Sequence, residues 1–162
     1  MHHIRLVATA AVMAVLASLP SQAASPERLE QRAHAAELAG HLHDASMLYQ
    51  AAVVAKPSRA QSYLALAQFY SRHGENHFAR KYFAEALYLN PKMIPALAGA
   101  GRTDLALGDR KGAQSYLTRL QHVCGAHCPQ AQELTAAMSA PQSAPKQVAA
   151  KQVAAKASLD KR

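Results

Sequence analysis

Tryptophan is absent from this chain of 162 residues, and only 6% of the residues are aromatic. Half of the chain nevertheless counts as hydrophobic, and much of that fraction is Ala, which buries little area per residue. Small apolar side chains suit closely packed helices better than a deep β-sandwich. The composition therefore favours an all-α domain.

Sequence patterns typical of catalysis are also missing. The chain contains no nucleophile elbow, no phosphate-binding loop and no pair of carboxylates in a supporting context. We therefore predict a protein that is not an enzyme and needs no cofactor.

A clustered basic surface is missing too, although the formal net charge is +8. Residues 25–140 carry 12 Lys or Arg against 9 Asp or Glu, whereas residues 141–162 carry five basic residues against one acidic residue. Charge is thus mixed over the body and concentrated only in a short tail. Nucleic-acid binding needs a basic patch, so we do not expect it here.

The N-terminal segment, at positions 1–23, contains the three parts of a secretory signal peptide. His2, His3 and Arg5 precede the uncharged, mainly apolar stretch 6–19, and Pro20 and the segment 21–23, with small residues at both of its ends, follow it. The apolar stretch is shorter than the ~20 residues of a membrane-spanning helix, which makes a retained anchor the weaker alternative. We expect cleavage near Ala23 and a periplasmic or secreted mature protein.

An internal repeat, in which similar residues recur every 34 positions, is the strongest pattern in the chain. Five columns of similar residues recur at this step: Gly40, Gly74 and Gly108; Ala45, Ala79 and Ala113; Tyr49, Phe83 and Leu117; Ala52 and Ala86; Pro57 and Pro91. The stretch 63–70 places apolar side chains at i, i+3, i+4 and i+7, the spacing of an amphipathic helix. Gly74 then allows a tight turn, and Pro91 stops the following helix.

These columns resemble the motif of the tetratricopeptide repeat family, with units at 26–59, 60–93 and 94–127. The motif positions are occupied by Leu29, Ala33, Gly40, Ala45, Tyr49, Ala52 and Pro57; by Tyr63, Leu66, Ala67, Tyr70, Gly74, Ala79, Phe83, Ala86 and Pro91; and by Leu97, Ala100, Gly101, Gly108, Ala113 and Leu117. The resemblance implies an all-α superhelix, or solenoid, of three helix hairpins.

The resemblance also implies a non-catalytic scaffold that binds a protein or peptide in a concave groove. At the groove positions of the motif stand Gln31, His34, Glu37, Leu64, Gln68, Arg72, Arg102 and Leu105. The family's clamp for a C-terminal carboxylate needs Asn at positions where this chain has other residues, so we do not predict that clamp. Three units make only a short groove, and such a short stack is compatible with self-association or with docking in a larger assembly.

The region after the third unit is predicted to contain a capping helix and a tail. The segment 129–138 begins with Pro129 and places Leu134 and Met138 on one face, so we expect a final helix there. The segment 139–162 repeats Lys-Gln-Val-Ala-Ala without a steady apolar stripe, which predicts a disordered, basic tail. Such a tail would add weak attraction to anionic envelope surfaces.

Cys124 and Cys128 are the only cysteines. In an exported protein they favour a disulfide, which would tie the third unit to the capping helix where the usual Pro is missing. Some exported bacterial members of the family carry a similar paired-Cys turn. Two alternatives stay open: a metal site that uses His122 and His127 together with both cysteines, or a redox-active pair.

Overall fold

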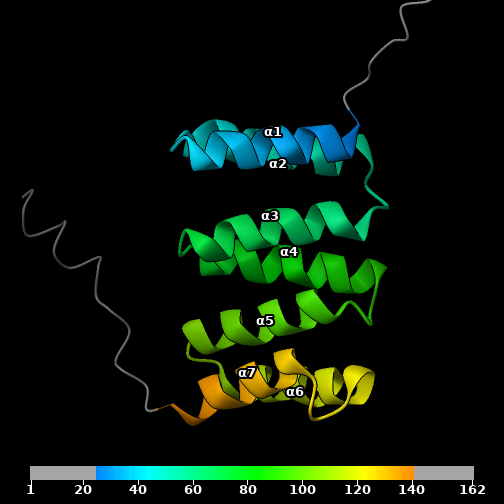
Figure 1. The fold of residues 1–162 in the computed structure, drawn as a ribbon, viewed down its shortest axis with the longest axis vertical. Helices are drawn as coiled ribbons and strands as arrows, with labels where there is room; N and C mark the ends of the chain where they lie inside the picture. The colour runs from blue at the N-terminus through cyan, green and yellow to red at the C-terminus, as the bar shows by residue number, and fades with distance from the viewer. Residues whose placement is uncertain (1–24, 141–162) are drawn as a thin grey trace, which may run out of the picture.

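The computed structural model describes residues 25–140, and these residues form seven α-helices and no strand (Figure 1). The helices are α1 (Pro26–Leu38), α2 (Leu42–Ala55), α3 (Ala60–Arg72), α4 (Asn76–Leu89), α5 (Ile94–Ala106), α6 (Arg110–Cys124) and α7 (Pro129–Ser139). The expected all-α solenoid of helix hairpins is confirmed. The capping helix was predicted at 129–138, and α7 continues for one further residue.

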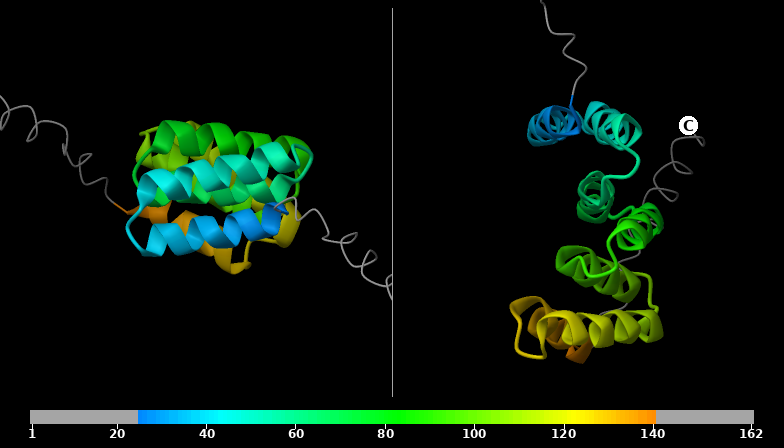
Figure 2. Two further views of the ribbon diagram at one scale, coloured as in Figure 1. Left: turned by 90° about the horizontal axis from the view of Figure 1, so that it is seen from above. Right: turned by 90° about the vertical axis from the view of Figure 1, so that its right-hand side faces the viewer.

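The hairpins α1/α2, α3/α4 and α5/α6 follow one another along a single stack. Each helix packs mainly against its hairpin partner and against the next hairpin (Figure 1). The side view in Figure 2 places α1, α3 and α5 toward one side of the stack and α2 and α4 toward the other, with α6 below α5. The last helix, α7, packs on both α5 and α6, as the first helix of a fourth unit would.

The turn inside each hairpin is built in the same way three times. The glycines at 40, 74 and 108 have φ angles of 80°, 76° and 81°, a left-handed conformation that side chains with a Cβ rarely adopt. The amide that follows each glycine donates to the carbonyl five residues earlier, as from Glu75 to Tyr70 at 2.9 Å. These bonds satisfy carbonyls that the helix end leaves open.

The ends of the second helices depend on Pro or on its substitute. Pro57 and Pro91 lie just beyond α2 and α4. The equivalent position after α6 is Gly125, which has a φ angle of 84° and ends the helix without a proline.

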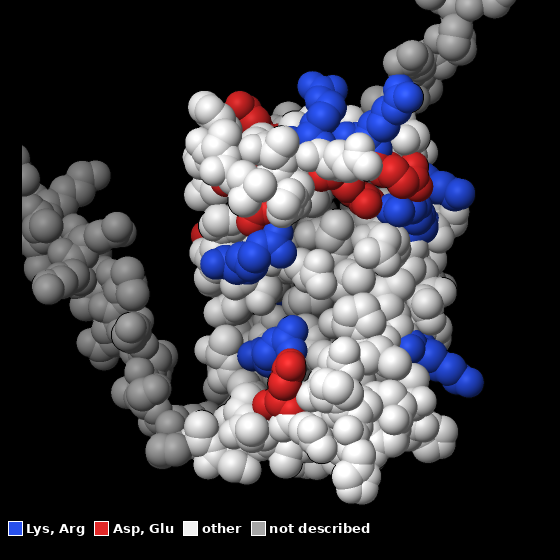
Figure 3. Space-filling view, viewed as in Figure 1, with Lys and Arg blue, Asp and Glu red and all other residues white. Residues whose placement is uncertain are grey.

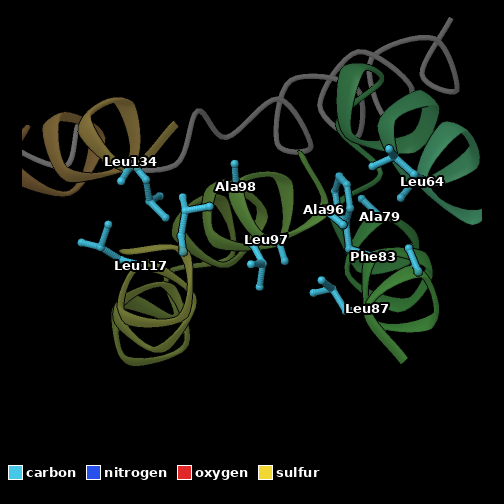
Figure 4. Packing of buried hydrophobic residues seen from close by; sticks show 14 residues of the cluster. Leu64, Ala79, Phe83, Leu87, Ala96, Leu97, Ala98, Leu117 and Leu134 are labelled. Atoms are coloured by element: carbon cyan, nitrogen blue, oxygen red, sulfur yellow. The ribbon is translucent and has the colours of Figure 1, made fainter. Parts of the chain in front are cut away.

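The main core lies among α3, α4, α5, α6 and α7 (Figure 4). Phe83 of α4 is 1% exposed and points at the backbone of α5, where Gly99 leaves room for its ring. Leu134 of α7 is fully buried in the same cluster and lies against Gly101. Glycines at these two positions allow the helices to approach closely, and α7 thereby covers the end of the core.

A second, smaller cluster joins the first hairpin to the second. Its buried members are Ala33, Ala45, Tyr49, Leu66 and Phe69. The rings of Tyr49 and Phe69 lie 5.4 Å apart. Because only five buried side chains form this cluster, the first hairpin has fewer apolar contacts to the rest than the other hairpins do.

Two predicted segments lie outside the described residues. They are the signal peptide at 1–23 and almost all of the basic tail at 139–162. Within residues 25–140, no helix has both the length and the apolar character that crossing a bilayer requires.

Candidate interaction face

Three of the predicted groove residues form one column of the repeat. His34, Gln68 and Arg102 are each one repeat apart and lie on α1, α3 and α5, the helices that share one side of the stack. His34 and Arg102 are exposed, and Gln68 is half-buried. We call the surface formed by these helices the α1/α3/α5 face.

The remaining predicted groove residues differ in how much surface they offer. Gln31 is exposed on α1, and Leu105 is half-buried on α5. Leu64, in contrast, is 2% exposed, because it packs in the main core with residues of α4 and α5. Its side chain therefore supports α5 instead of facing a ligand, unlike the prediction.

Arg72, predicted as a ligand-binding residue, is bonded to Glu37. Its Nε and Nη2 atoms donate to the two carboxylate oxygens of Glu37 at 2.9 and 2.7 Å. His73 Nε2 lies 2.9 Å from the same carboxylate, and the Tyr49 hydroxyl donates to it at 3.2 Å. Helices α1, α2 and α3 thus meet at one carboxylate.

The electrostatics of this cluster follow from its geometry. Hydrogen bonding to Arg72 lowers the pKa of Glu37 from 4.5 to about 2, against the opposing effect of burial. The same contact raises the pKa of Arg72. Burial, followed by the charge of Glu37, raises the pKa of Tyr49. At neutral pH the cluster is therefore an anionic carboxylate held by a cation, not an open cationic site.

Two other arginines of this region also face glutamates of a neighbouring helix. Arg59, just before α3, contacts Glu27 at 3.1 Å and also pairs with Glu30. Arg102 lies 3.7 Å from Glu133 of α7, with both side chains at least half exposed. Arg59 and Arg72 thus link the start and end of α3 to α1, and Arg102 links α5 to α7.

Between these charged groups the α1/α3/α5 face is uncharged. Figure 3 shows a broad area over the middle of α3 and α5 without Lys, Arg, Asp or Glu. The ligand that such a surface suits is an uncharged or apolar segment, because paired arginines offer little free charge to an acidic one.

A second polar link, between α4 and α5, was missed by the sequence analysis. Arg80 Nε lies 3.0 Å from Asp104 Oδ1, and Arg80 Nη2 lies 2.7 Å from Asp109 Oδ2. Asp104 is 1% exposed, and burial raises its pKa although the Arg80 charge opposes this. The Arg80–Asp104 contact is an ion pair without an aligned hydrogen bond. The repeat contained one signal: Asp104 is the only charged residue in its column, where the other two units have Ala36 and Tyr70.

Cys124 and Cys128 are bonded in the structure, with α-carbons 5.9 Å apart. The bond connects the last residue of α6 to the residue before α7. His122 and His127 are exposed. Within residues 25–140, no three His, Cys, Asp or Glu side chains are placed so that they could hold a metal ion, and this includes the four residues of this turn.

A protein-family model matches most of the chain. Residues 29–159 match the family described as the cilia and flagella-associated protein 70 middle TPR-like domain. No curated protein sequence matches the chain significantly.

Solved structures resemble the fold at low sequence identity. The TPR domain of Arabidopsis OM64 has a TM-score of 0.63 at 16% identity, and the match covers 70% of this chain and 93% of that one. The first TPR of Spaghetti (RPAP3), bound to the HSP90 peptide SRMEEVD, has 0.62 at 18%, with 72% and 94% covered. The Yersinia enterocolitica chaperone SycD, in complex with a peptide of the translocator YopD, has 0.59 at 23%, with 70% and 86% covered.

Proposed function

The chain belongs to the tetratricopeptide repeat family, and from this premise we propose that it is an exported, non-catalytic scaffold that binds a protein or peptide on its α1/α3/α5 face. One observation carries the proposal. The column His34, Gln68 and Arg102 lies on the first helices of three successive hairpins, and the α1/α3/α5 face has a broad area without charged side chains over the middle of α3 and α5 (Figure 3). Two of the similar structures contain a bound peptide, which supports the same class of function here.

The uncharged middle of the face indicates the chemistry of the ligand. Arg72 is bonded through two nitrogen atoms to Glu37, so an acidic ligand would have to displace that contact. We therefore propose an extended or helical segment that is mainly apolar, with polar contacts from the column at 34, 68 and 102. If Arg72 and Arg102 were unpaired, they would favour an acidic peptide instead.

Replacing the column tests the proposal. Binding partners are first identified by crosslinking them to the protein through a photoreactive group at position 61, which is exposed on α3. The triple variant H34A/Q68A/R102A should then bind these partners with at least tenfold lower affinity than the unchanged protein does. The matched control is another column of exposed residues at the same spacing, H43A/H77A/K111A, on α2, α4 and α6. Equal binding by both variants would exclude the α1/α3/α5 face as the binding surface.

Export is the second part of the proposal. The apolar stretch 6–19 and the small residues before Ala24 support it, and so does the bonded cysteine pair, because disulfides persist in oxidising compartments. Mass spectrometry of the protein from fractionated cells should find a chain that begins near Ala24 and has two hydrogens fewer than its reduced form. A full-length, reduced chain in the cytosol would refute export.

A further inference from the structure

Exposed large hydrophobic side chains are unevenly distributed over residues 25–140. Seven are exposed, none of them on α5, α6 or α7, and six lie on α2 and α4: Leu42, Met47, Val54, Phe78, Tyr88 and Leu89. Concentration of apolar surface on one part of a molecule is typical of an interaction site. These two helices lie on the side of the stack away from the α1/α3/α5 face (Figure 2).

Helix α4 presents a stripe of four residues whose spacing is symmetric about residue 83. Phe78, Lys81, Glu85 and Tyr88 are spaced by three, four and three residues, which places them on one face of the helix. All four are exposed, Phe78 by 52% and Tyr88 by 82%. An aromatic ring thus lies at each end, with a cation and an anion between them.

The stripe rests on a fixed support. The ring of Phe78 stacks on Tyr70 at 5.2 Å, and Tyr82 stacks on the same ring at 5.6 Å. The Tyr70 hydroxyl is within hydrogen-bond distance of Ser46 and Gln50 of α2, at 3.3 Å each. Because the Phe78 ring already packs on Tyr70, it loses little conformational freedom when a partner binds.

The corresponding helices of the other hairpins lack this pattern. One repeat later, the four positions are Gly112, Ser115, Arg119 and His122; one repeat earlier, they are Asp44, Met47, Ala51 and Val54. In addition, Gly112 lies close to Asp104, which forms an ion pair with Arg80 of α4. The stripe is therefore a property of α4 alone and is not required by the repeat.

We propose that this stripe is the interface with a second copy of the chain, related by a two-fold axis that passes near residue 83. Antiparallel packing of the two α4 helices about that axis places Lys81 opposite Glu85 of the partner subunit, and Phe78 opposite Tyr88 of the partner subunit. Each of these two contacts then occurs twice, as a two-fold interface requires.

The charges of the stripe favour a second copy of the chain over an unrelated protein as the binding partner. Within the part of the chain that the structure describes, neither Lys81 nor Glu85 forms an ion pair. Lys81 instead lies 5.4 Å from the centre of the Tyr82 ring. Two opposite charges placed symmetrically about residue 83 complement a second copy of themselves. A dimer of this kind leaves the α1/α3/α5 face of both subunits open.

A charge swap tests the dimer. Sedimentation of the purified chain over a concentration series should give a dimer with a Kd on the order of micromolar, because one helix per subunit makes a small interface. Lys81→Glu and Glu85→Lys alone should each weaken the dimer at least tenfold, since they oppose like charges. The double variant K81E/E85K restores opposite pairs and should regain most of the affinity.

Two further variants distinguish this interface from a general charge effect. Tyr88→Ala should weaken the dimer without changing the unfolding of the monomer, because Tyr88 is 82% exposed. Lys111→Glu changes the charge equally at an exposed position on α6 and should leave the dimer unchanged. A chain that remains monomeric up to about a millimolar, or a dimer that the single reversals do not weaken, would overturn the proposal. This result would leave the α1/α3/α5 face untouched.

Discussion

Phe83 and Gly99 illustrate how a single pair of side chains sets the distance between two repeats. The Phe83 ring is buried directly against α5, and a Cβ atom built on Gly99 would lie 2.3 Å from it. In a close-packed core, the ring has no empty space into which it could shift. The small residue is therefore required here by packing, although glycine is a poor helix former.

Gly99→Ala should lower the free energy of unfolding by roughly 1–3 kcal/mol, because it overpacks the core. Without the clash, the same change inside a helix would raise stability by about 1 kcal/mol. Urea unfolding measures the difference. The control is a double-mutant cycle with Phe83→Leu: the smaller side chain should make Gly99→Ala less harmful. If the two changes are additive, the ring is not the cause.

At the scale of helices, the Glu37 cluster joins α1 and α2 to α3. The carboxylate of Glu37 has a side chain that is 9% exposed, and its folded pKa of about 2 lies below its ordinary value of 4.5. Ionised Glu37 therefore stabilises the folded state fully above about pH 5, and this contribution is lost as the pH falls from 4.5 through 2.

Glu37→Gln should cost roughly 1–3 kcal/mol at pH 7, a range reduced for the partial exposure of Arg72. The difference from the native protein should shrink as the pH is lowered toward 2, because protonated Glu37 no longer attracts Arg72. Thermal unfolding of both proteins across pH 2–7 gives this comparison. A difference that does not depend on pH would show that the carboxylate charge has no part in the junction.

The disulfide belongs to the same scale, because it connects α6 to α7. Closing so short a loop contributes about 2 kcal/mol in the chain-entropy model. The variant C124S/C128S should lose up to that amount, and hydrogen exchange should increase first in α7. Faster exchange spread equally over all helices would contradict a local tether.

On the scale of the whole molecule, stability should vary along the stack. Solenoid repeats contact only their neighbours, so each hairpin depends on the interfaces beside it. The buried apolar cluster that joins the first hairpin to α3 has five members, whereas α3 to α7 share a core of fourteen buried residues. Helix α7 covers one end of the described stack, and α1 forms the other end.

Native-state hydrogen exchange should therefore show faster exchange in α1 and α2 than in α4 and α5. The measurement distinguishes local opening from global unfolding by its dependence on denaturant. Uniform protection along the stack would mean that the two clusters unfold as one unit, contrary to this expectation. Glu37→Gln should increase exchange in α1 further while leaving α5 unchanged.

The sequence by itself determined the repeat unit of this protein. Turn glycines at 40, 74 and 108 and the small residues Ala45, Ala79 and Ala113 act within one hairpin, so their spacing predicts helices, turns and fold. The positions of His34, Gln68 and Arg102 on one side followed from the same period. Local rules sufficed because each hairpin is defined by residues close in sequence.

Only the tertiary structure decided which of these side chains stay available. Leu64 stood at a groove position and is buried in the main core, and Arg72 is hydrogen-bonded to Glu37 of the preceding hairpin. The buried pair Arg80–Asp104 likewise joins different hairpins, and the ring of Tyr70 that supports Phe78 is bonded to α2 of the hairpin before it. Contacts between repeats depend on how the hairpins stack, and the period of the repeat does not specify the chemistry of that stacking.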